Sequence, residues 1–324
     1  MREVLLAIKN LKVEFHTDDG VYKVLDGVDL EIGRGESMGL VGETGCGKSV
    51  TGFTILGLIP KPAGKIVEGE ILFEGQDLLK LPEKEMRKIR GEKISMIFQN
   101  PFSSLNPAYT IGDQISEAIL LHQEVKGRKG LRDKTIKILE MVGFPNPAGH
   151  LNDYPHQLSG GMRQRAFIAM ALSCNPPLLI ADEPTTALDV TIQAQVLALM
   201  ADLNHRAGFS LLLISHDLGI ISQMCDQVSI MYAGSIVETT GMENFFSNHK
   251  HPYSNGLIGS IPRIGDRKAV IETIPGVVPS LVNPPPGCRF HPRCADAMDR
   301  CQKEKPVLRG IAPGHKVACF RFER

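Results

Sequence analysis

The sequence predicts an α/β fold in which helices alternate with short buried strands. One observation is that the runs Ser37–Val41, 177–181 and Ser210–Ser215 are short and mostly apolar, as strands buried on both faces are. A second is that predicted helices follow two of these runs, at residues 50–58 and 192–203. The chain has 324 residues, which corresponds to about two domains of roughly 150 residues each.

Between the first predicted strand and its helix lies a glycine-rich segment that fills every position of a phosphate-binding loop. Its residues are Gly42, Glu43, Thr44, Gly45, Cys46, Gly47, Lys48 and Ser49. The glycines allow a tight turn whose N–H groups point inward at phosphate oxygens. Lys48 supplies a charge for the β- and γ-phosphates, and Ser49 supplies a hydroxyl for Mg²⁺. The strand–loop–helix context supports the motif, so we predict that this loop binds a nucleoside triphosphate.

A second anion site is predicted at Ser159, Gly160 and Gly161, which follow Leu158. Ser159 is suited to cap a helix whose apolar positions recur at helical spacing. The unpaired N–H groups and the positive dipole end of such a helix attract phosphate. Taken alone, the segment is explained by an ordinary capped helix. The phosphate-binding loop and the acids described next favour a nucleotide contact instead.

Polar residues follow the two later strands. Asp182 and Glu183 come after the run 177–181, and His216 comes after Ser210–Ser215. Acids and a lone histidine are common at solvated strand ends. Here we expect them to lie at the same edge of the sheet as the phosphate loop, and this position favours a catalytic role over a solvated strand end. Asp182 is predicted to hold Mg²⁺, Glu183 to polarise the attacking water and His216 to contact the γ-phosphate.

Composition excludes several classes of protein. The 36 basic and 36 acidic residues cancel, so no overall field attracts nucleic acid or anionic lipid. No apolar run approaches the ~18 residues that a membrane span requires, and residues 1–9 do not resemble a signal peptide. Cys46, Cys174 and Cys225 show no disulfide pattern and fit a reducing cytosol. We therefore expect any solute pathway to lie in other chains.

The ordered motifs resemble the nucleotide-binding subunit of an ATP-binding cassette (ABC) transporter, over about the first three-quarters of the chain. They are the phosphate loop, Gln99, Leu158–Gly161, Asp182 with Glu183, the segment 187–189, and His216. The resemblance implies a P-loop NTPase core of RecA type, an antiparallel β subdomain and a helical insertion. Met162 stands where glutamine is usual in the family, and this is typical of its peptide-importer branch.

The resemblance also assigns roles that the residues alone do not. Gln99 is implied to touch the metal and to face the membrane subunits. Phe15, or alternatively Tyr22, is implied to stack on adenine, and Val50 and Asp189 are implied to join the ATP site. Two ATPase subunits, identical or different, are implied to sandwich each ATP between one phosphate loop and the other subunit's Ser159–Gly161 segment.

The implied partners are two transmembrane permeases and an extracytoplasmic peptide-binding protein, at the cytoplasmic face of the membrane, with no nucleic acid. The predicted domains are an ATPase domain at 1–250, with a helical insertion at about 100–157, and an extension at 251–324.

Four of the seven cysteines lie close to the end of the chain with the spacing C-x5-C-x6-C-x17-C. They are Cys288, Cys294, Cys301 and Cys319. Such density in a cytosolic protein indicates a metal, and the spacing leaves zinc and an iron–sulfur cluster about equally favoured, with free thiols as a weaker third. The tail resembles the C-terminal extension of dipeptide, oligopeptide and nickel importer ATPases, which implies a 4Fe–4S cluster on these cysteines. Because few residues between Pro284 and Arg324 are apolar, a metal is expected to order the tail.

Three classes of function follow. The first is an ATPase that powers uptake of di- or oligopeptides, with nickel import as the alternative within the same branch. The second is a non-transport cassette ATPase acting on DNA or ribosomes, which the single signature segment disfavours. The third is an idle regulatory subunit, which the intact set of Lys48, Asp182, Glu183 and His216 disfavours.

Overall fold

The computed structural model describes residues 3–99, 105–186, 188–261 and 273–323. Ala187 and residues 100–104 of the predicted insertion lie outside the described residues. The chain divides into two compact units. The first unit comprises Met1–Glu3, Gly33–Ser37 and Lys80–Ile214, and the second comprises Val4–Ile32, Met38–Leu79 and Ser215–Arg324.

The first unit contains parallel strands, and the sequence predicts the two at 177–181 and Ser210–Ser215. The strands are β6 (Ile94–Ile97), β7 (Leu178–Asp182) and β8 (Ser210–Ser215), with β7 between the other two. Ile180 of β7 pairs with Met96 on one side and with Leu212 on the other. Every residue of these strands is buried, which explains why the runs are almost continuously apolar.

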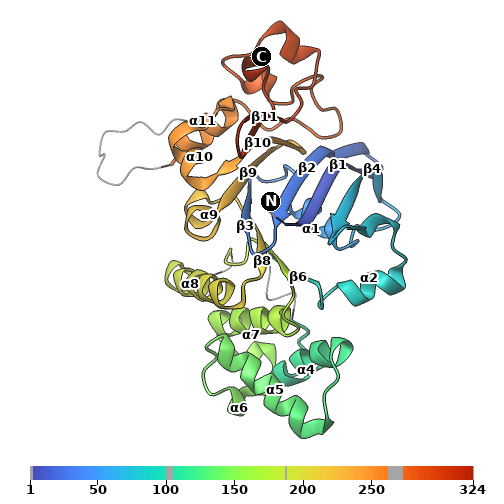
Figure 1. The fold of residues 1–324 in the computed structure, drawn as a ribbon, viewed down its shortest axis with the longest axis vertical. Coiled ribbons are helices and arrows are strands. Elements are labelled where there is room, and N and C mark those ends of the chain that lie inside the picture. Colours follow the sequence, from blue (N-terminus) through green and yellow to red (C-terminus); the bar gives the residue numbers. More distant parts are fainter. Residues whose placement is uncertain (1–2, 100–104, 187, 262–272, 324) are drawn as a thin grey trace. The chain divides into compact units, whose positions relative to one another are not determined.

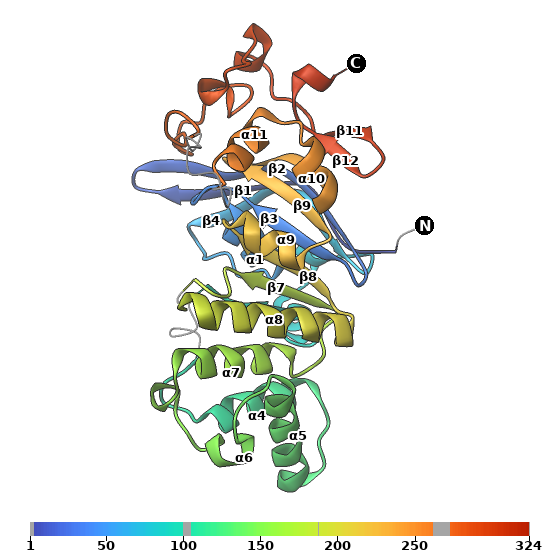
Figure 2. The same ribbon diagram turned by 90° about the vertical axis from the view of Figure 1, so that its left-hand side faces the viewer.

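Helices form the rest of the first unit. They are α2 (Glu83–Ile89), α4 (Ile111–His122), α5 (Gly127–Met141), α6 (Pro147–His150), α7 (Gly160–Leu172) and α8 (Val190–Ala207). The helices α4, α5 and α7 pack against one another, and of these α4 and α5 lie within the predicted insertion at about 100–157 (Figures 1 and 2). Gly208 ends α8 in the left-handed conformation, with φ 66°.

An antiparallel sheet opens the second unit. Its strands β1 (Val4–Thr17), β2 (Gly20–Gly33), β4 (Gly64–Phe73) and β5 (Gln76–Asp77) lie in the order β2-β1-β4-β5. Figure 1 shows β2, β1 and β4 side by side. In β1 and β4, Leu6 pairs with Phe73 and Ile8 with Ile71, and all four side chains are buried. This sheet agrees with the antiparallel subdomain that the family resemblance implies.

A second sheet of this unit carries the phosphate loop. Strand β3 (Ser37–Val41) is parallel to β9 (Gln227–Tyr232), and β9 is antiparallel to β10 (Ser235–Gly241). The helices of the unit are α1 (Lys48–Ile55), α9 (Leu218–Met224), α10 (Met242–Asn248) and α11 (Pro252–Gly259). Over the described part of the chain, no helix combines the length and the apolar character that crossing a membrane requires.

The end of the chain extends this same sheet. Strand β12 (His315–Val317) pairs with β10, and β11 (Arg309–Ala312) pairs with β12. Phe290, Val317 and Phe320 are buried. The expectation that a metal is needed to order this tail is therefore too strong, because strand pairing and buried aromatic residues also hold it. Short 3₁₀ turns η3 (His291–Arg293), η4 (Asp299–Gln302) and η5 (Phe320–Phe322) connect its loops.

Candidate functional site

The phosphate-binding loop joins β3 to α1 in the second unit. Gly45 and Gly47 have φ values of 81° and 107°, a region that residues with a side chain rarely adopt. Lys48 begins α1, and its Nζ donates hydrogen bonds to the carbonyl oxygens of Gly42 (2.7 Å) and Glu43 (3.1 Å). The lysine charge is therefore held directly at the turn that the sequence predicts to receive phosphate.

The loop is packed tightly on the strand beside it. A Cβ atom at Gly42 would lie 2.1 Å from the carbonyl oxygen of Met231 in β9, so only glycine fits there. The Gly234 N–H donates to the carbonyl oxygen of Cys46 at 2.8 Å. Burial raises the pKa of the Cys46 thiol, which keeps it neutral and supports its interpretation as a small apolar residue.

Glu183 has an unusual backbone in the first unit. Its φ is 44°, in the left-handed region, and its N–H donates to the carbonyl oxygen of Ile214 at 2.9 Å. Its carboxylate oxygen Oε2 accepts hydrogen bonds from Gln99 Nε2 and from Thr186 Oγ1, both at 2.9 Å. The structure thus brings together two predicted catalytic residues, Gln99 and Glu183, and adds Thr186, which the sequence did not single out.

Asp182, the residue before Glu183, ends β7 and is 1 % exposed. It pairs in register with Ile214 of β8. A carboxylate at a buried strand end offers the hard oxygen ligands that Mg²⁺ prefers. The donor type therefore fits the predicted magnesium ligand.

The predicted signature segment starts a capped helix. Ser159 Oγ accepts a hydrogen bond from the Met162 N–H at 3.3 Å at the start of α7. Asp189 caps α8 in the same way, accepting from the Ile192 N–H at 3.0 Å. A Cβ atom at Gly161 would lie 3.0 Å from Ile192 Cγ2, so the first turns of the two helices lie side by side. Two predicted ATP contacts, separate in sequence, are thus adjacent in the first unit.

Sequence reasoning missed Gln164, which connects α7 to the catalytic turn. Its side chain is completely buried, and Nε2 donates to the carbonyl oxygen of Pro184 at 2.6 Å. Pro184 directly follows Glu183, so α7 fixes the turn that carries the predicted base. A polar side chain on the buried side of an apolar helix was the available signal, because a buried amide requires a partner.

Other predicted site residues lie elsewhere in the second unit. Phe15 on β1 and Tyr22 on β2 are half-buried, as are Ser49 and Val50 in the first turn of α1. Thr44 and His216 are exposed. His216 follows β8 directly, and the next residue, Asp217, caps α9. The choice between Phe15 and Tyr22 for adenine stacking stays a prediction.

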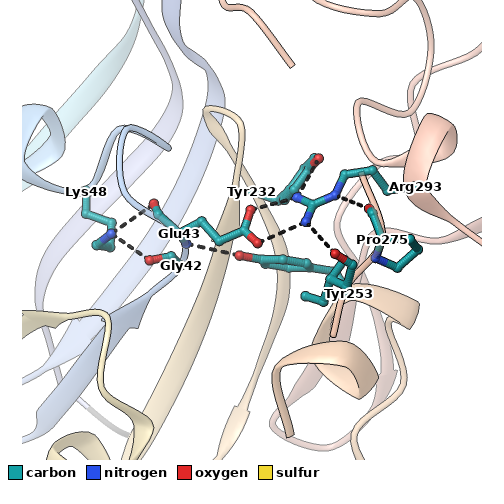
Figure 3. A network of polar contacts seen from close by, with 8 residues as sticks. Gly42, Glu43, Lys48, Tyr232, Tyr253, Pro275 and Arg293 are labelled. Atoms are coloured by element: carbon teal, nitrogen blue, oxygen red, sulfur yellow. Dashed lines mark hydrogen bonds and ion pairs between the residues drawn. The ribbon is translucent and has the colours of Figure 1, made fainter. Parts of the chain in front are cut away.

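A polar network around Glu43 was also missed (Figure 3). The Glu43 carboxylate receives both guanidinium NH₂ groups of Arg293, at 2.7 and 3.1 Å, and the Glu43 N–H donates to Tyr253 Oη at 3.0 Å. Burial raises the pKa of Tyr253, so its hydroxyl stays protonated. Arg293 lies 250 residues beyond Glu43, and no local pattern in the sequence signals such a pair.

The four clustered cysteines line one small cavity of about 20 Å³ in the second unit. Phe290, Met298 and Phe320 form part of its apolar wall. Burial raises the pKa of the Cys288 thiol to about 11, and the sulfurs of Cys301, Cys319 and Cys294 add to the rise. Among the described residues, no group of three or more histidine, cysteine or acidic side chains is arranged to hold a metal ion. The cysteines are gathered as predicted, and a bound metal stays a proposal.

The comparisons with known proteins agree with this fold and loop. The ABC transporter family matches residues 25–186, and the family described as "Oligopeptide/dipeptide transporter, C-terminal region" matches residues 237–301. Among solved structures, the chain is similar to the dimeric, post-hydrolysis ATP-binding cassette MJ0796 bound to ADP and phosphate (27% identity, TM-score 0.65). That similarity covers 73% of this chain and 98% of the other. The fold and the phosphate loop therefore define an ABC transporter ATPase.

Curated relatives identify the branch. The oligopeptide transport ATP-binding protein AppD of Bacillus subtilis is 49% identical over 98% of this chain and 97% of its own length. The dipeptide transport ATP-binding protein DppD of the same organism is 46% identical over 98% of this chain and 95% of its own length. The chain belongs to the ATP-binding proteins of oligopeptide and dipeptide ABC transporters, and its activity is ATP hydrolysis.

Proposed function

We propose that this chain powers the uptake of di- or oligopeptides by hydrolysing ATP between two ATPase subunits beneath a pair of permeases. The observation that carries the proposal is the geometry of Glu183. A carboxylate held by Gln99 and Thr186, on a backbone in the left-handed region, is positioned at some energetic cost. Such positioning is expected of a catalytic base and is not needed in a solvated strand end.

Each proposed catalytic role matches the chemistry of its side chain. Lys48 stabilises charge on the β- and γ-phosphates, and Glu183 orients and deprotonates the attacking water. His216 contacts the γ-phosphate, and Gln99 orients Glu183 through the 2.9 Å hydrogen bond between them. Ser49 and Asp182 supply oxygen ligands for Mg²⁺, which when bound neutralises charge on the transferred phosphoryl group.

We propose that the second ATPase subunit closes the site with its own Ser159–Gly161 helix start. A capped N-terminus with exposed N–H groups is an anion site, and Asp189 lies at the adjacent helix start. ATP then stabilises the closed pair of subunits, and hydrolysis removes the charge that holds it. The partner is either a second copy or a related ATPase.

The cargo is proposed from the relatives, whose names specify oligopeptide and dipeptide transport. The match of residues 237–301 to the oligopeptide/dipeptide transporter C-terminal family supports this choice. The assembly would include two permeases and an extracytoplasmic peptide-binding protein, and this chain would act at the cytoplasmic face of the membrane.

We also propose a 4Fe–4S cluster on Cys288, Cys294, Cys301 and Cys319. The four sulfurs share one cavity with an apolar wall, which suits a group bound by four thiolates. The spacing of the cysteines alone leaves zinc open, and the resemblance of this tail to the extension of peptide-importer ATPases favours the cluster. The cluster would supply positive charge that favours the thiolates, and its proposed role is structural.

The Glu183→Gln variant tests the hydrolytic role. The amide keeps the size of the side chain and cannot accept the proton of the attacking water. We expect ATP binding to persist, ATP-dependent dimers to accumulate, and hydrolysis to fall about 10³-fold or more, on the order of 4 kcal/mol of barrier. Phosphate release and gel filtration with and without ATP are the measurements.

Thr186→Val is the milder companion variant, because it removes one hydrogen bond to Glu183 and leaves the carboxylate. It should reduce turnover less than Glu183→Gln does. If Glu183→Gln hydrolysed ATP at close to the parent rate, Glu183 would not be the base. Uptake of labelled peptides and of nickel by cells with and without the gene then separates peptide import from the nickel alternative.

A further inference from the structure

We propose that Arg293 and Tyr253 are positioning residues of the phosphate-binding loop, through which the cysteine-rich extension sets the affinity of the loop for ATP. The proposal deepens the proposed function and rests on it for the identity of the ligand. It is carried by contacts within the second unit, in which residues of α11 and of the extension hold both the backbone and the side chain of Glu43 (Figure 3).

Arg293 uses all of its N–H donors in this network. Besides its two bonds to the Glu43 carboxylate, Nε donates to the carbonyl oxygen of Pro275 at 2.9 Å and one NH₂ group donates to that of Ile274 at 3.3 Å. The remaining donor reaches Tyr232 Oη at 3.4 Å. The Arg293 side chain is only 6% exposed. A planar fork with this set of partners fixes the carboxylate in one orientation, which lysine does not reproduce.

Tyr253 holds the backbone of the same residue. Its ring is completely buried and packs edge-on against Tyr232, with ring centroids 4.7 Å apart. Its hydroxyl oxygen accepts the Glu43 N–H. The N-cap residue His251 orients Tyr253 by accepting its N–H at 3.1 Å. The acceptor for the Glu43 N–H is therefore built into the start of α11.

Glu43 connects Arg293 and Tyr253 directly to Lys48, the lysine of the phosphate loop. The Glu43 carbonyl oxygen accepts a hydrogen bond from Lys48 Nζ, so a single residue contacts Arg293, Tyr253 and Lys48. Because its peptide groups are planar, a rotation of Glu43 displaces its carbonyl oxygen and the turn that follows. Loss of the Arg293 or Tyr253 contact therefore alters the geometry offered to the β- and γ-phosphates.

Two of the clustered cysteines lie directly beside buried arginines, and they connect the contacts around Glu43 to the rest of the extension. Arg293 directly precedes Cys294, and Arg289 directly follows Cys288. Arg289 is also buried, pairs with Asp26 at 3.1 Å, and donates to the carbonyl oxygen of Ala233. The segment between Cys288 and Cys294 is thus bound near both of its ends to other parts of the second unit.

A purely structural role is the alternative, in which these residues only attach the extension to the sheet. The two explanations differ in what they predict for ATP. A structural role lowers the thermal midpoint and leaves nucleotide affinity of the folded protein unchanged. A positioning role weakens ATP binding in protein that is folded at the assay temperature.

The test uses the full chain, purified under nitrogen, with Arg293→Gln, Arg293→Lys and Tyr253→Phe variants. The control is Arg300→Gln, because Arg300 lies in the same extension but makes its contacts elsewhere, pairing with Glu304 and Glu323 and stacking on Phe320. Calorimetric titration with Mg-ATP in the Glu183→Gln background gives the Kd without hydrolysis. The same variants on the parent chain give KM and kcat.

We expect Arg293→Gln to raise the Kd and KM for ATP roughly tenfold with less than about a twofold change in kcat, because charge-assisted hydrogen bonds to the loop are lost. Arg293→Lys should recover only part of the affinity, and Tyr253→Phe should show a smaller loss. Arg300→Gln should bind as the parent does. A Kd within twofold of the parent for both Arg293→Gln and Tyr253→Phe would overturn the proposal.

A variant that does not fold, and a failure of the proposed catalytic roles, can both be distinguished from failure of this proposal. If Arg293→Gln does not fold, Tyr253→Phe decides the question, since it removes one hydroxyl and keeps the ring. Binding is measured without turnover. A parent chain that binds ATP and never hydrolyses it would therefore contradict the catalytic roles, and it would leave the positioning role of Arg293 and Tyr253 unaffected.

Discussion

At the scale of single residues, Glu183 combines a strained backbone with a carboxylate held by two neighbours. A left-handed conformation costs a residue other than glycine about 1 kcal/mol or more. The N–H of Glu183 donates to the carbonyl oxygen of Ile214. The carbonyl oxygen of the following residue, Pro184, accepts a hydrogen bond from Gln164. These contacts on both sides of the residue explain why the conformation persists.

The residue roles divide into those visible in the sequence and those created by the fold. Ser159 was recognisable as a helix cap, because capping requires only a side-chain oxygen before a helix start. Arg293 was not recognisable, since its partner lies 250 residues away. The left-handed backbone of Glu183 had only a partial signal, because the following Pro184 disfavours right-handed helical values but favours extended ones.

His251 provides a residue-scale prediction for pH. It is completely buried, and burial lowers its pKa to about 3 from its ordinary 6.5. Between these values the unfolded chain binds a proton and the folded chain does not. The free energy of unfolding therefore falls as the pH drops below 6.5, by at most about 1.4 kcal/mol per pH unit from this group.

The matched variant is His251→Asn, because asparagine can still cap α11 at the Tyr253 N–H. Urea unfolding at several pH values between 7 and 5 should show a shallower loss of stability in the variant than in the parent. Equal slopes in the two proteins would mean that His251 is protonated in the folded state.

At the scale of elements, α7 contributes both a capped N-terminus and a buried amide. The sequence predicted the cap and an amphipathic helix with one apolar side. In the structure, most of the helix from Gln164 to Leu172 is buried, and Phe167 stacks on Phe98, the residue before Gln99, with centroids 6.3 Å apart. The extra burial arises from packing on several sides, which helical periodicity does not encode.

The Gln164→Leu variant tests what α7 contributes to the catalytic turn. Leucine fits the apolar surroundings and leaves the Pro184 carbonyl oxygen without this donor. We expect a loss of about 1–3 kcal/mol in the free energy of unfolding, and a fall in kcat, because the turn that carries Glu183 is less constrained.

Met170→Leu on the same helix is a control, since it keeps volume and removes no hydrogen bond. Thermal denaturation and steady-state ATPase assays provide both readouts. An unchanged kcat in Gln164→Leu would show that other contacts suffice to hold Glu183.

At the scale of the whole molecule, the short apolar strands were the elements that the sequence predicted most accurately. The runs at Ser37–Val41 and Ser210–Ser215 coincide with β3 and β8. The tail was less predictable, because β12 joins β10 through backbone hydrogen bonds and its composition appears loop-like. Glu238 illustrates the difficulty, since it is fully buried in β10 and accepts hydrogen bonds from the Lys250 and His251 N–H groups.

Removal of the proposed cluster tests the connection between the tail and the rest of the second unit. Anaerobic chelation of iron should speed amide hydrogen exchange between Cys288 and Cys301, and also in the loop from Gly42 to Gly47. The second effect follows because Arg293, beside Cys294, contacts Glu43.

Cys174→Ser protein, which keeps all four clustered cysteines, serves as the control for thiol content. Iron and acid-labile sulfide are measured before and after chelation. Stoichiometric zinc without iron or sulfide would contradict the cluster, and unchanged exchange in the loop would contradict its connection to the tail.

The second unit has a consequence for biosynthesis, because it is assembled from segments that lie far apart in the sequence. A ribosome releases Glu43 210 residues before Tyr253 and 250 residues before Arg293. At 5–20 residues per second, these intervening residues take about 10 to 50 s to make. Throughout that interval the nascent phosphate loop lacks the partners that hold it, so we expect ribosome-bound fragments ending before Arg293 to bind ATP poorly and to associate with chaperones.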